Sequence, residues 1–280
     1  MGTMRQRRLG RELRELREGA GLAHTQAIEQ LGWSRAKLDR IESGATTPKE
    51  SDLKAALDLY GAGSDQRARL VELRQEARQR GWWTAYGDVF SGSYVAWEHD
   101  AQRIRDWQPQ VIPGLLQVED YARAVIAGAR PTDAPEAIER RVQARMARRT
   151  LLGRHDAPEL HAIIDESVLL RQIGGTEVLG RQLRYLRDCL QRPNITVQVL
   201  PLAAGGHPGV DGAFIILSYT DPFIPDVPYS EGPFGDLYPE SATEVARINS
   251  AWEHLAAKAL SAEASANLIT GLADRSEADR

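Results

Sequence analysis

The segment from Ser34 to Gly44, with the sequence SRAKLDRIESG, limits most strongly what this chain can fold into. Ser34 is a favourable helix N-cap, because its hydroxyl can accept a hydrogen bond from an unpaired N–H of the first turn. Leu38 and Ile41 recur at helical spacing and predict one buried stripe. Glycine is common just after a helix end, as at Gly44. The segment therefore predicts a short helix that buries only a narrow face.

The other faces of this helix carry the cations Arg35, Lys37 and Arg40. A helix that buries little and presents cations fits the DNA major groove, where arginine can bind guanine through two hydrogen bonds. Basic helix faces are also common on solvated surfaces. This helix alone therefore leaves a DNA-binding and a purely structural interpretation open.

The surrounding segments favour the DNA-binding interpretation. Helices are expected over residues 5–18 and 24–31, with Gly32 at a tight turn before the helix that follows Ser34. A fourth helix is expected after Pro48. An Arg-rich helix is expected over 64–80 as a connector, and its arginines either contact DNA phosphate or face solvent. Such a series of short helices is typical of a helix-turn-helix bundle. We assign residues 1–62 to this domain and 63–80 to the connector.

This region resembles the Cro/cI-type (Xre) helix-turn-helix family over about residues 7–61. The resemblance rests on Leu16-Arg17, Gly21-Leu22, Ala27, Leu31-Gly32-Trp33-Ser34-Arg35, Leu38, Ile41-Glu42-Ser43-Gly44 and Pro48. It implies that Arg17 and Glu42 form a partly buried pair. It also implies that the base-reading positions are Ser34, Arg35, Ala36, Lys37 and Arg40.

One position departs from the family pattern. The family usually begins its second helix with Thr-Gln, where this chain has Ala23 and His24. Alanine is a poor N-cap and costs about 1 kcal/mol relative to threonine or serine. His24 could donate to a phosphate when protonated, which would tighten DNA binding below about pH 6.5; a neutral, solvated histidine is the alternative. Thr46, Thr47 and Lys49 are further phosphate-binding candidates.

The charge is divided unevenly along the chain. Residues 1–80 hold 16 Lys and Arg against 12 Asp and Glu, whereas the remainder holds 19 against 27, which gives the overall net charge of −4. The basic excess thus lies with the predicted DNA-binding domain, and the acidic remainder limits nonspecific attraction to DNA.

We expect a cytoplasmic protein that does not enter a membrane. The N-terminus lacks a secretory signal pattern, and no apolar run approaches the roughly 20 residues needed to span a bilayer. The single Cys189 excludes an internal disulfide and fits a reducing compartment.

Residues 81–280 predict an α+β domain, so the expected fold is an all-α bundle of five helices followed by this domain. An amphipathic helix is expected over 94–107. Further helices are expected at about 117–127, 135–152, 175–191, 241–259 and 261–272. Strands are expected at 160–164, 195–200, 214–219 and 227–230, which predicts a small sheet of about four strands. The arginines of the 135–152 helix form a second basic patch. We interpret this patch as an ordinary surface face of the helix and not as a nucleic-acid site.

This second part also resembles a known group. The runs WQPQVIPGLLQVEDYARAVI, AIIDESVLLRQIGG and ITVQVLPLAAGGHPGVDGAFIILSY are similar to regulators with an Xre-type head and a C-terminal domain of unknown function. The similarity extends over about residues 81–271. Such proteins are often called antitoxin-like regulators and lie beside a small partner protein. The resemblance therefore implies a protein partner but no mechanism.

Several polar residues near strand ends and in a Gly-rich loop are candidates for an effector site, since such residues often gather at ligand sites. They are Asp165, Glu166, His207, Asp211, Tyr229 and Glu231. Asp165 and Glu166 are explained more simply as the N-cap and first turn of a following helix. The sequence lacks H-E-x-x-H, G-x-S-x-G and P-loop motifs, and its histidines lack metal-ligand spacing. We therefore expect no catalytic residue, no metal and no cofactor.

The sequence thus predicts a sequence-specific transcriptional regulator that binds double-stranded DNA and is not an enzyme. A single recognition helix contacts few base pairs, so we expect a homodimer on a palindromic operator. The C-terminal domain would bind a small-molecule effector or a partner protein. The alternative is an antitoxin-like interaction protein that binds a small partner protein and uses DNA binding only for autoregulation.

Overall fold

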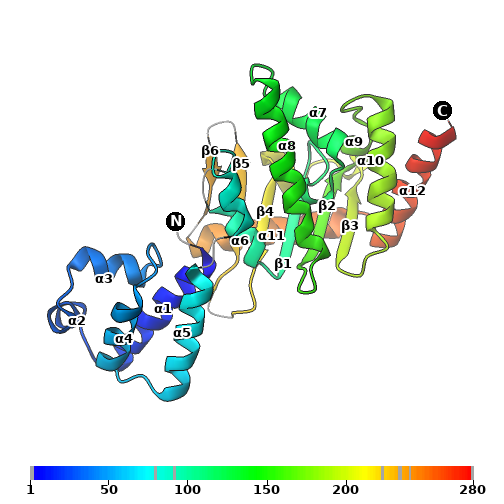
Figure 1. Cartoon of the computed structure of the whole chain (residues 1–280). Helices are drawn as coiled ribbons and strands as arrows, with labels where there is room; N and C mark the ends of the chain where they lie inside the picture. Colours follow the sequence, from blue (N-terminus) through cyan, green and yellow to red (C-terminus); the bar gives the residue numbers. More distant parts are fainter. Residues whose placement is uncertain are drawn as a thin grey trace. The chain divides into compact units, whose positions relative to one another are not determined.

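The computed structural model describes residues 3–78, 81–90, 93–221, 224–232, 235–239 and 241–278. The chain forms two compact units, Met1–Asp100 and Ala101–Arg280. The first is helical and the second is α+β (Figure 1). Residues 81–100, which the sequence pattern groups with the second domain, belong to the first unit.

Within residues 3–78 the first unit contains five α-helices, as the sequence predicts. They are α1 (Met4–Gly19), α2 (His24–Leu31), α3 (Arg35–Glu42), α4 (Glu50–Leu59) and α5 (Ser64–Arg78). Thr3 caps α1, since its hydroxyl accepts from the Gln6 N–H at 3.2 Å and the Gln6 side chain accepts from the Thr3 N–H at 2.8 Å. The core consists mainly of leucines from α1, α3, α4 and α5, among them Leu13, Leu38 and Leu70. The α5 helix is therefore part of the bundle core, not a solvated linker.

The expected helix over 94–107 is wrong in its second half. Helix α6 (Tyr94–Asp100) ends the first unit, and strand β1 (Arg103–Gln108) follows within three residues. Apolar residues at 94, 97, 101 and 104 match a helical period, but β1 is hydrogen-bonded to a neighbouring strand on each side. Pairing in the sheet therefore overrides the local pattern. The α6 helix packs on α1, with the Arg7 guanidinium 4.5 Å from the Trp97 ring centroid and the Arg5–Asp100 ion pair at 3.1 Å.

The described residues of the second unit form a six-stranded sheet in the order β3-β2-β1-β4-β5-β6. The strands are β1, β2 (Glu159–Asp165), β3 (Ile195–Leu200), β4 (Phe214–Ser218), β5 (Val227–Gly232) and β6 (Gly235–Leu237). Strands β1, β2 and β3 are parallel, and β4, β5 and β6 are antiparallel to their neighbours. The expected count of about four strands is too low. It omits β1, assigned to a helix, and β6, whose three exposed residues give no apolar signal.

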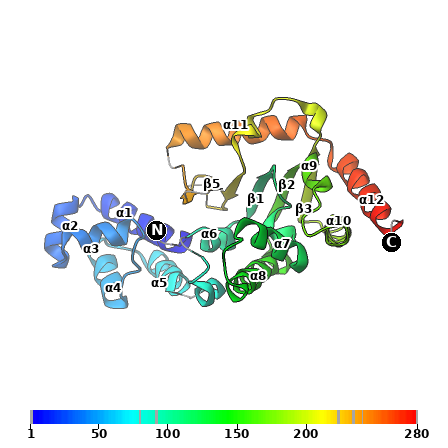
Figure 2. The same ribbon diagram turned by 90° about the horizontal axis from the view of Figure 1, so that it is seen from above.

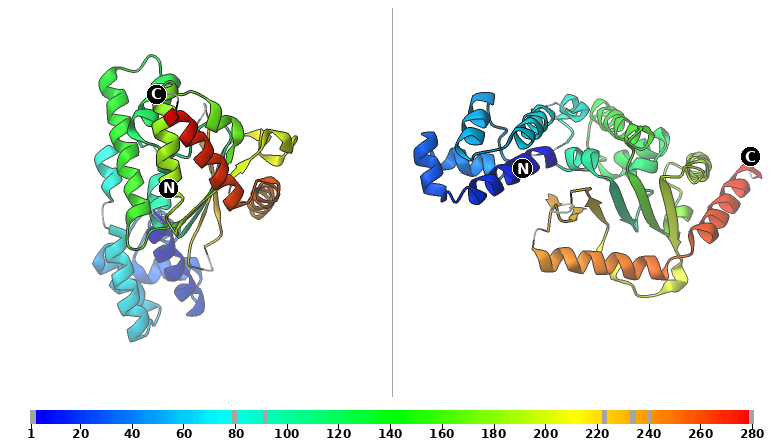
Figure 3. Two further views of the ribbon diagram at one scale, coloured as in Figure 1. Left: turned by 90° about the vertical axis from the view of Figure 1, so that its right-hand side faces the viewer. Right: turned by 90° about the horizontal axis from the view of Figure 1, so that it is seen from below.

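Helices cover both faces of this sheet. They are α7 (Glu119–Ala129), α8 (Pro135–Arg149), α9 (Glu166–Leu170), α10 (Thr176–Cys189), α11 (Ala242–Lys258) and α12 (Ala262–Ala278). Short 3₁₀ helices lie at Trp82–Tyr86 in the first unit and at Gly114–Leu116, Thr150–Gly153, Leu202–Ala204 and Pro208–Asp211 in the second. The crossover helices α7, α8 and α10 lie on one face and α11 on the other (Figures 2 and 3). Under α11, Trp252 and Leu255 pack against Trp107, Ile163 and Ile216.

Among the helices in the described ranges, none combines the length and apolar character that a membrane crossing requires.

Candidate nucleic-acid interface

Helices α2 and α3 form the predicted helix-turn-helix. Gly32 ends α2 with a φ of 63°, a left-handed conformation that glycine adopts without steric cost. Ser34 then caps α3, because its hydroxyl accepts from the Lys37 N–H at 3.2 Å. Leu38 and Ile41 are 1% and 3% exposed and fix α3 to the bundle. The chain thus holds α3 by its inner stripe and leaves its N-terminal turn at the surface.

The outer face of α3 presents four of the five predicted base-reading positions to solvent. Ser34, Arg35, Ala36 and Arg40 are exposed, and the Arg35 side chain retains 85% of its accessible area. Among the described residues, the Arg40 side chain has no hydrogen-bond or ion-pair partner. Arg35 and Arg40 are therefore available to a ligand outside the bundle.

Lys37 differs from these positions because its ammonium group contacts the bundle. Its Nζ lies 2.7 Å from an Asp52 carboxylate oxygen on α4 and 4.4 Å from the centroid of the Trp33 ring. The side chain is 33% exposed. To reach a base edge, Lys37 must give up the Asp52 ion pair, so this structure gives it a role in joining α3 to α4.

His24 and Asp39 form a polar contact across the two helices. The Nε2 atom of His24 lies 2.8 Å from Asp39, whose other carboxylate oxygen is 3.8 Å from the Arg35 Nε. Asp39 is not among the residues predicted from the sequence, although its position four residues after Arg35 on a helix is a recognisable ion-pair spacing. Ala23 makes no side-chain cap; instead, its N–H donates to the Gln26 side chain at 2.8 Å.

The residues after α3 lie beside the same surface. Thr46 and Lys49 are exposed, whereas Thr47 is half-buried and accepts a hydrogen bond from the Gln6 amide at 3.0 Å. Gly44 has a φ of 72°, and a Cβ there would lie 2.6 Å from the Arg7 backbone nitrogen. The end of α3 therefore packs directly on the backbone of α1.

Gly10 of α1 completes this close approach and is not among the residues predicted from the sequence. A Cβ added at Gly10 would lie 2.7 Å from the carbonyl oxygen of Glu42 and would also collide with that of Ile41. Gly10 is in the middle of a helix, where glycine is disfavoured by about 1 kcal/mol relative to alanine. A glycine at this unfavourable position is the sequence feature that could have indicated a packing role.

Arg17 and Glu42 form the pair that the family resemblance implies. Two parallel hydrogen bonds of 2.7 and 3.0 Å join them, and the side chains are 6% and 8% exposed. Arg17 also donates to the Leu22 carbonyl at 2.9 Å. The hydrogen bonds that Arg17 donates to Glu42 raise the pKa of Arg17, and burial together with the Glu42 charge raises the pKa of Tyr60 to about 12.

The connector arginines mostly have partners within the first unit. Arg74 is buried and donates to the Pro48 carbonyl at 2.9 Å, Arg67 pairs with Asp58 at 2.6 Å, and Arg69 pairs with Glu12 at 2.8 Å. Arg78 is exposed. These contacts favour a structural role for α5.

Two family models match the chain. Residues 8–70 match one described as a helix-turn-helix domain, and residues 91–271 match one described as a domain of unknown function (DUF5753). The second match covers more than half of the chain. The chain belongs to the DUF5753 family. Comparisons with curated proteins and with solved structures found no match. The N-terminal match supports a DNA-binding regulator.

The predicted effector residues lie at three places in the DUF5753 domain. Asp165 ends β2 and caps α9 by accepting from the Ser167 N–H at 2.9 Å, and Glu166 accepts from the Leu202 N–H at 2.9 Å. The simpler explanation, a helix cap and first turn, therefore describes this pair. His207 packs edge-on against Trp107 with ring centroids 5.4 Å apart, and Asp211 is exposed.

The other two effector candidates lie on the β5–β6 hairpin. Tyr229 is buried and donates to Asp236 at 3.0 Å, and burial together with the Glu231 and Asp236 charges raises its pKa. Glu231 is exposed on β5. In the described part of the chain, no group of three or more His, Cys, Asp or Glu is placed to hold a metal ion.

The basic helix α8 supports the fold of the DUF5753 domain. Arg145 donates to the buried Gln117 side chain at 2.9 Å, Arg149 donates to the Gln117 carbonyl at 3.0 Å, and Arg141 pairs with Asp133 at 3.4 Å. The Arg149 guanidinium also lies 4.5 Å from the Tyr185 ring centroid. These contacts agree with the structural interpretation of the second basic patch.

Proposed function

We propose that the first unit binds double-stranded DNA sequence-specifically, with α3 in the major groove, and that the chain regulates transcription as an Xre-type protein. Arg35 and Arg40 read base edges, and Ala36 contacts a thymine methyl group. The observation that carries this proposal is the outer face of α3, where two arginines are exposed on a helix that Leu38 and Ile41 fix to the bundle.

Phosphate contacts come from the residues that flank α3. Thr46 and Lys49 are exposed, and His24 lies at the start of α2. A protonated His24 can donate to a phosphate, but it must first leave the Asp39 carboxylate that lies 2.8 Å away. Thr47 can join them, because its hydroxyl oxygen accepts from Gln6 and its O–H can still donate to a phosphate.

The protein acts in the cytoplasm as a homodimer on a palindromic operator, because one short recognition helix reads too few base pairs for specificity in a genome. The DUF5753 domain receives the regulatory signal, a small-molecule effector or a partner protein, and has no catalytic role. Its net negative charge supports a basic partner.

The second candidate is an antitoxin-like protein whose main activity is binding a small partner protein. The acidic composition of the DUF5753 domain is the observation that favours it. Co-purification of a stoichiometric small basic protein, with DNA binding that changes only when that protein is present, would support this candidate over the first.

Selection of binding sites from random DNA tests the main proposal. The full-length protein should enrich one palindromic sequence motif. Arg35→Ala should relax the preference at one base pair of each half-site, whereas Arg67→Ala, which removes an arginine on α5, should leave the motif unchanged. Failure to enrich any motif, or an Arg35→Ala motif identical to that of the wild type, would contradict the proposal.

A further inference from the structure

Lys37 is the one cation of α3 that pairs with another helix within the described residues. Its ammonium nitrogen lies 2.7 Å from a carboxylate oxygen of Asp52 on α4 and 4.4 Å from the centroid of the Trp33 ring. The Lys37 and Asp52 side chains are 33% and 18% exposed. By contrast, Arg40 has no partner among the described residues, and Arg35 approaches only an acid of its own helix, at 3.8 Å. The bundle therefore holds one of the three cations of α3.

Asp52 is well placed to keep this ion pair. It is the third residue of α4, and a carboxylate in the first turn of a helix is stabilised by the helix dipole. The Trp33 ring, from the turn between α2 and α3, lies against the same ammonium group, and a cation over an aromatic face gains further attraction. Two groups from different segments thus fix the Lys37 ammonium.

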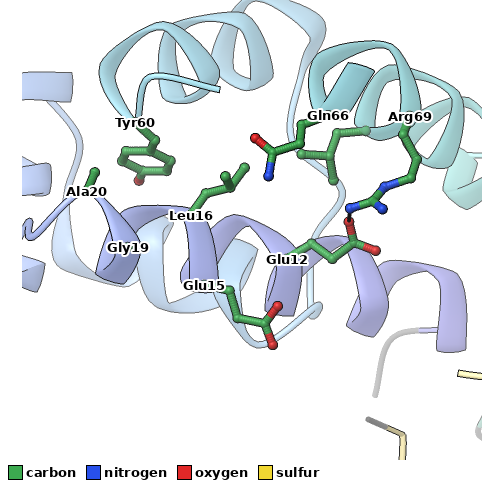
Figure 4. A pocket seen from close by; sticks show the side chains of 9 residues that line it. Glu12, Glu15, Leu16, Gly19, Ala20, Tyr60, Gln66 and Arg69 are labelled. Atoms are coloured by element: carbon green, nitrogen blue, oxygen red, sulfur yellow. Dashed lines mark hydrogen bonds and ion pairs between the residues drawn. The ribbon is translucent and has the colours of Figure 1, made fainter. Parts of the chain in front are cut away.

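Two other acids of the first unit pair with arginines of α5. Glu12 of α1 accepts from Arg69 at 2.8 Å beside a pocket of the bundle (Figure 4), and Asp58 of α4 pairs with Arg67 at 2.6 Å. These pairs join helices whose cations are not predicted to read bases. The Lys37–Asp52 pair differs, because it engages a predicted base-reading position.

We propose that Asp52 keeps Lys37 off the DNA and thereby sets the sequence-independent affinity of the protein. The effect rests on the proposed DNA-binding function of α3. Arg35 and Arg40 contact bases, whereas Lys37 stays on Asp52 in the complex and contacts neither base nor phosphate. When Asp52 is removed, the flexible Lys37 side chain pairs with a phosphate, a contact that carries no sequence information.

The ion pair limits how long the protein stays on DNA away from its operator. Each additional phosphate contact strengthens binding to every DNA sequence. A cation that is neutralised within the bundle removes one such contact and leaves the base contacts of Arg35 and Arg40 unchanged. Asp52 is thus a residue that tunes DNA affinity without touching DNA.

A double-mutant cycle of Lys37→Met and Asp52→Asn tests this role in the full-length protein, with DNA affinity measured against salt concentration. Asp52→Asn should tighten binding to the selected operator and to scrambled DNA about five- to tenfold at roughly 0.1 M salt, the effect of one added phosphate contact. Its slope of log affinity against log salt should steepen by about 0.9. The double variant replaces a neutral pair by two neutral side chains and should match the wild type in affinity and slope.

The cycle separates the proposal from two alternatives. If Lys37 contacts DNA in the wild type, the double variant loses affinity and its salt slope becomes shallower. If Asp52 acts only by repelling DNA, the double variant binds as tightly as Asp52→Asn. Either result, or an Asp52→Asn protein that binds DNA like the wild type, would overturn the proposal. Site selection with Lys37→Met should return the wild-type motif, and a relaxed preference at one base pair would contradict it.

Glu50→Gln is the matched control for charge. It removes a carboxylate from the same turn of α4, and the Glu50 side chain is 85% exposed with a single ion pair of 3.7 Å to Arg74. Arg74 also donates to the Pro48 carbonyl and stays in place. The salt slope of Glu50→Gln should therefore equal that of the wild type. A slope as steep as that of Asp52→Asn would show a general charge effect and overturn the role of Lys37.

Lysine NMR follows the ion pair without relying on affinity. The chain has four lysines, so the side-chain signals of Lys37 can be assigned by their loss in Lys37→Met. The Trp33 ring should shift the Lys37 ε-methylene signals upfield in the free protein, because the Lys37 Nζ lies over its face. Operator DNA should leave this shift in place in the wild type and not in Asp52→Asn. Loss of the shift in the wild-type complex would overturn the proposal.

Failure of the proposed function would look different. Equal, weak binding of the wild type to the DNA upstream of its gene and to scrambled DNA would contradict sequence-specific binding by α3. The salt slopes of the four proteins on scrambled DNA would still test the role of Asp52, because a phosphate contact does not depend on sequence.

Discussion

Breaking the Arg17–Glu42 pair should destabilise the first unit strongly. The two hydrogen bonds of 2.7 and 3.0 Å connect side chains that are 6% and 8% exposed, so either partner left alone is a buried, uncompensated charge. Loss of one member of a buried pair typically costs about 3–5 kcal/mol, whereas replacing both members by apolar groups is often close to neutral. Arg17→Met and Glu42→Leu should therefore each cost about 3–5 kcal/mol. The double variant should lose less than either single variant.

Native-state amide hydrogen exchange of the full-length chain measures this effect, because peptides from α1 and α3 report the opening free energy of the first unit alone. Glu29→Gln is the control: Glu29 is exposed on α2, and its side chain has no hydrogen-bond or ion-pair partner among the described residues, so this change should leave the exchange unchanged. Additive losses in the double variant, or single variants that exchange like the wild type, would refute the reasoning.

Three further outcomes follow from the structure. Arg35→Ala should weaken operator binding by about 1–3 kcal/mol in a fluorescence-anisotropy titration and relax one base-pair preference; full affinity and unchanged preference would exclude Arg35 as a base reader. Gly10→Ala should destabilise the first unit by about 1–3 kcal/mol, because the added Cβ clashes with α3. Gly19→Ala is the control and should not destabilise the unit, because a Cβ at Gly19 has no neighbour within 4 Å. Equal melting temperatures of the two variants would contradict the packing argument. Since the phenol of Tyr60 ionises at about pH 12 when folded and near pH 10 when unfolded, the free energy of unfolding should fall by roughly 2–3 kcal/mol between these pH values. Tyr60→Phe should lack this part of the alkaline loss, and an identical slope in the variant would refute the assignment.

The helix-turn-helix could be predicted because its local signals agree with one another. Ser34 caps α3, Gly32 takes the left-handed turn, and Leu38 and Ile41 form the buried stripe. Asp165 follows the same logic, since its role as a helix cap depends only on its immediate neighbours. Signals of this kind need no knowledge of the tertiary structure.

The missed features depend on contacts that are distant in the sequence. Strand β1 follows α6 so closely that one helical period spans both, and only its pairing with β2 and β4 makes it a strand. Lys37 is held by Asp52, fifteen residues away, so its cationic character did not predict where its ammonium lies.

A salt titration of DNA binding tests the central claim most directly. The full-length protein is titrated against the DNA upstream of its own gene and against scrambled DNA of the same length, in parallel with Arg35→Ala. The proposal predicts tight binding to the upstream DNA alone, weakening steeply and linearly in log affinity against log salt concentration as phosphate contacts are lost. Equal, weak binding to both DNAs would contradict it, and would mean that α3 does not read sequence.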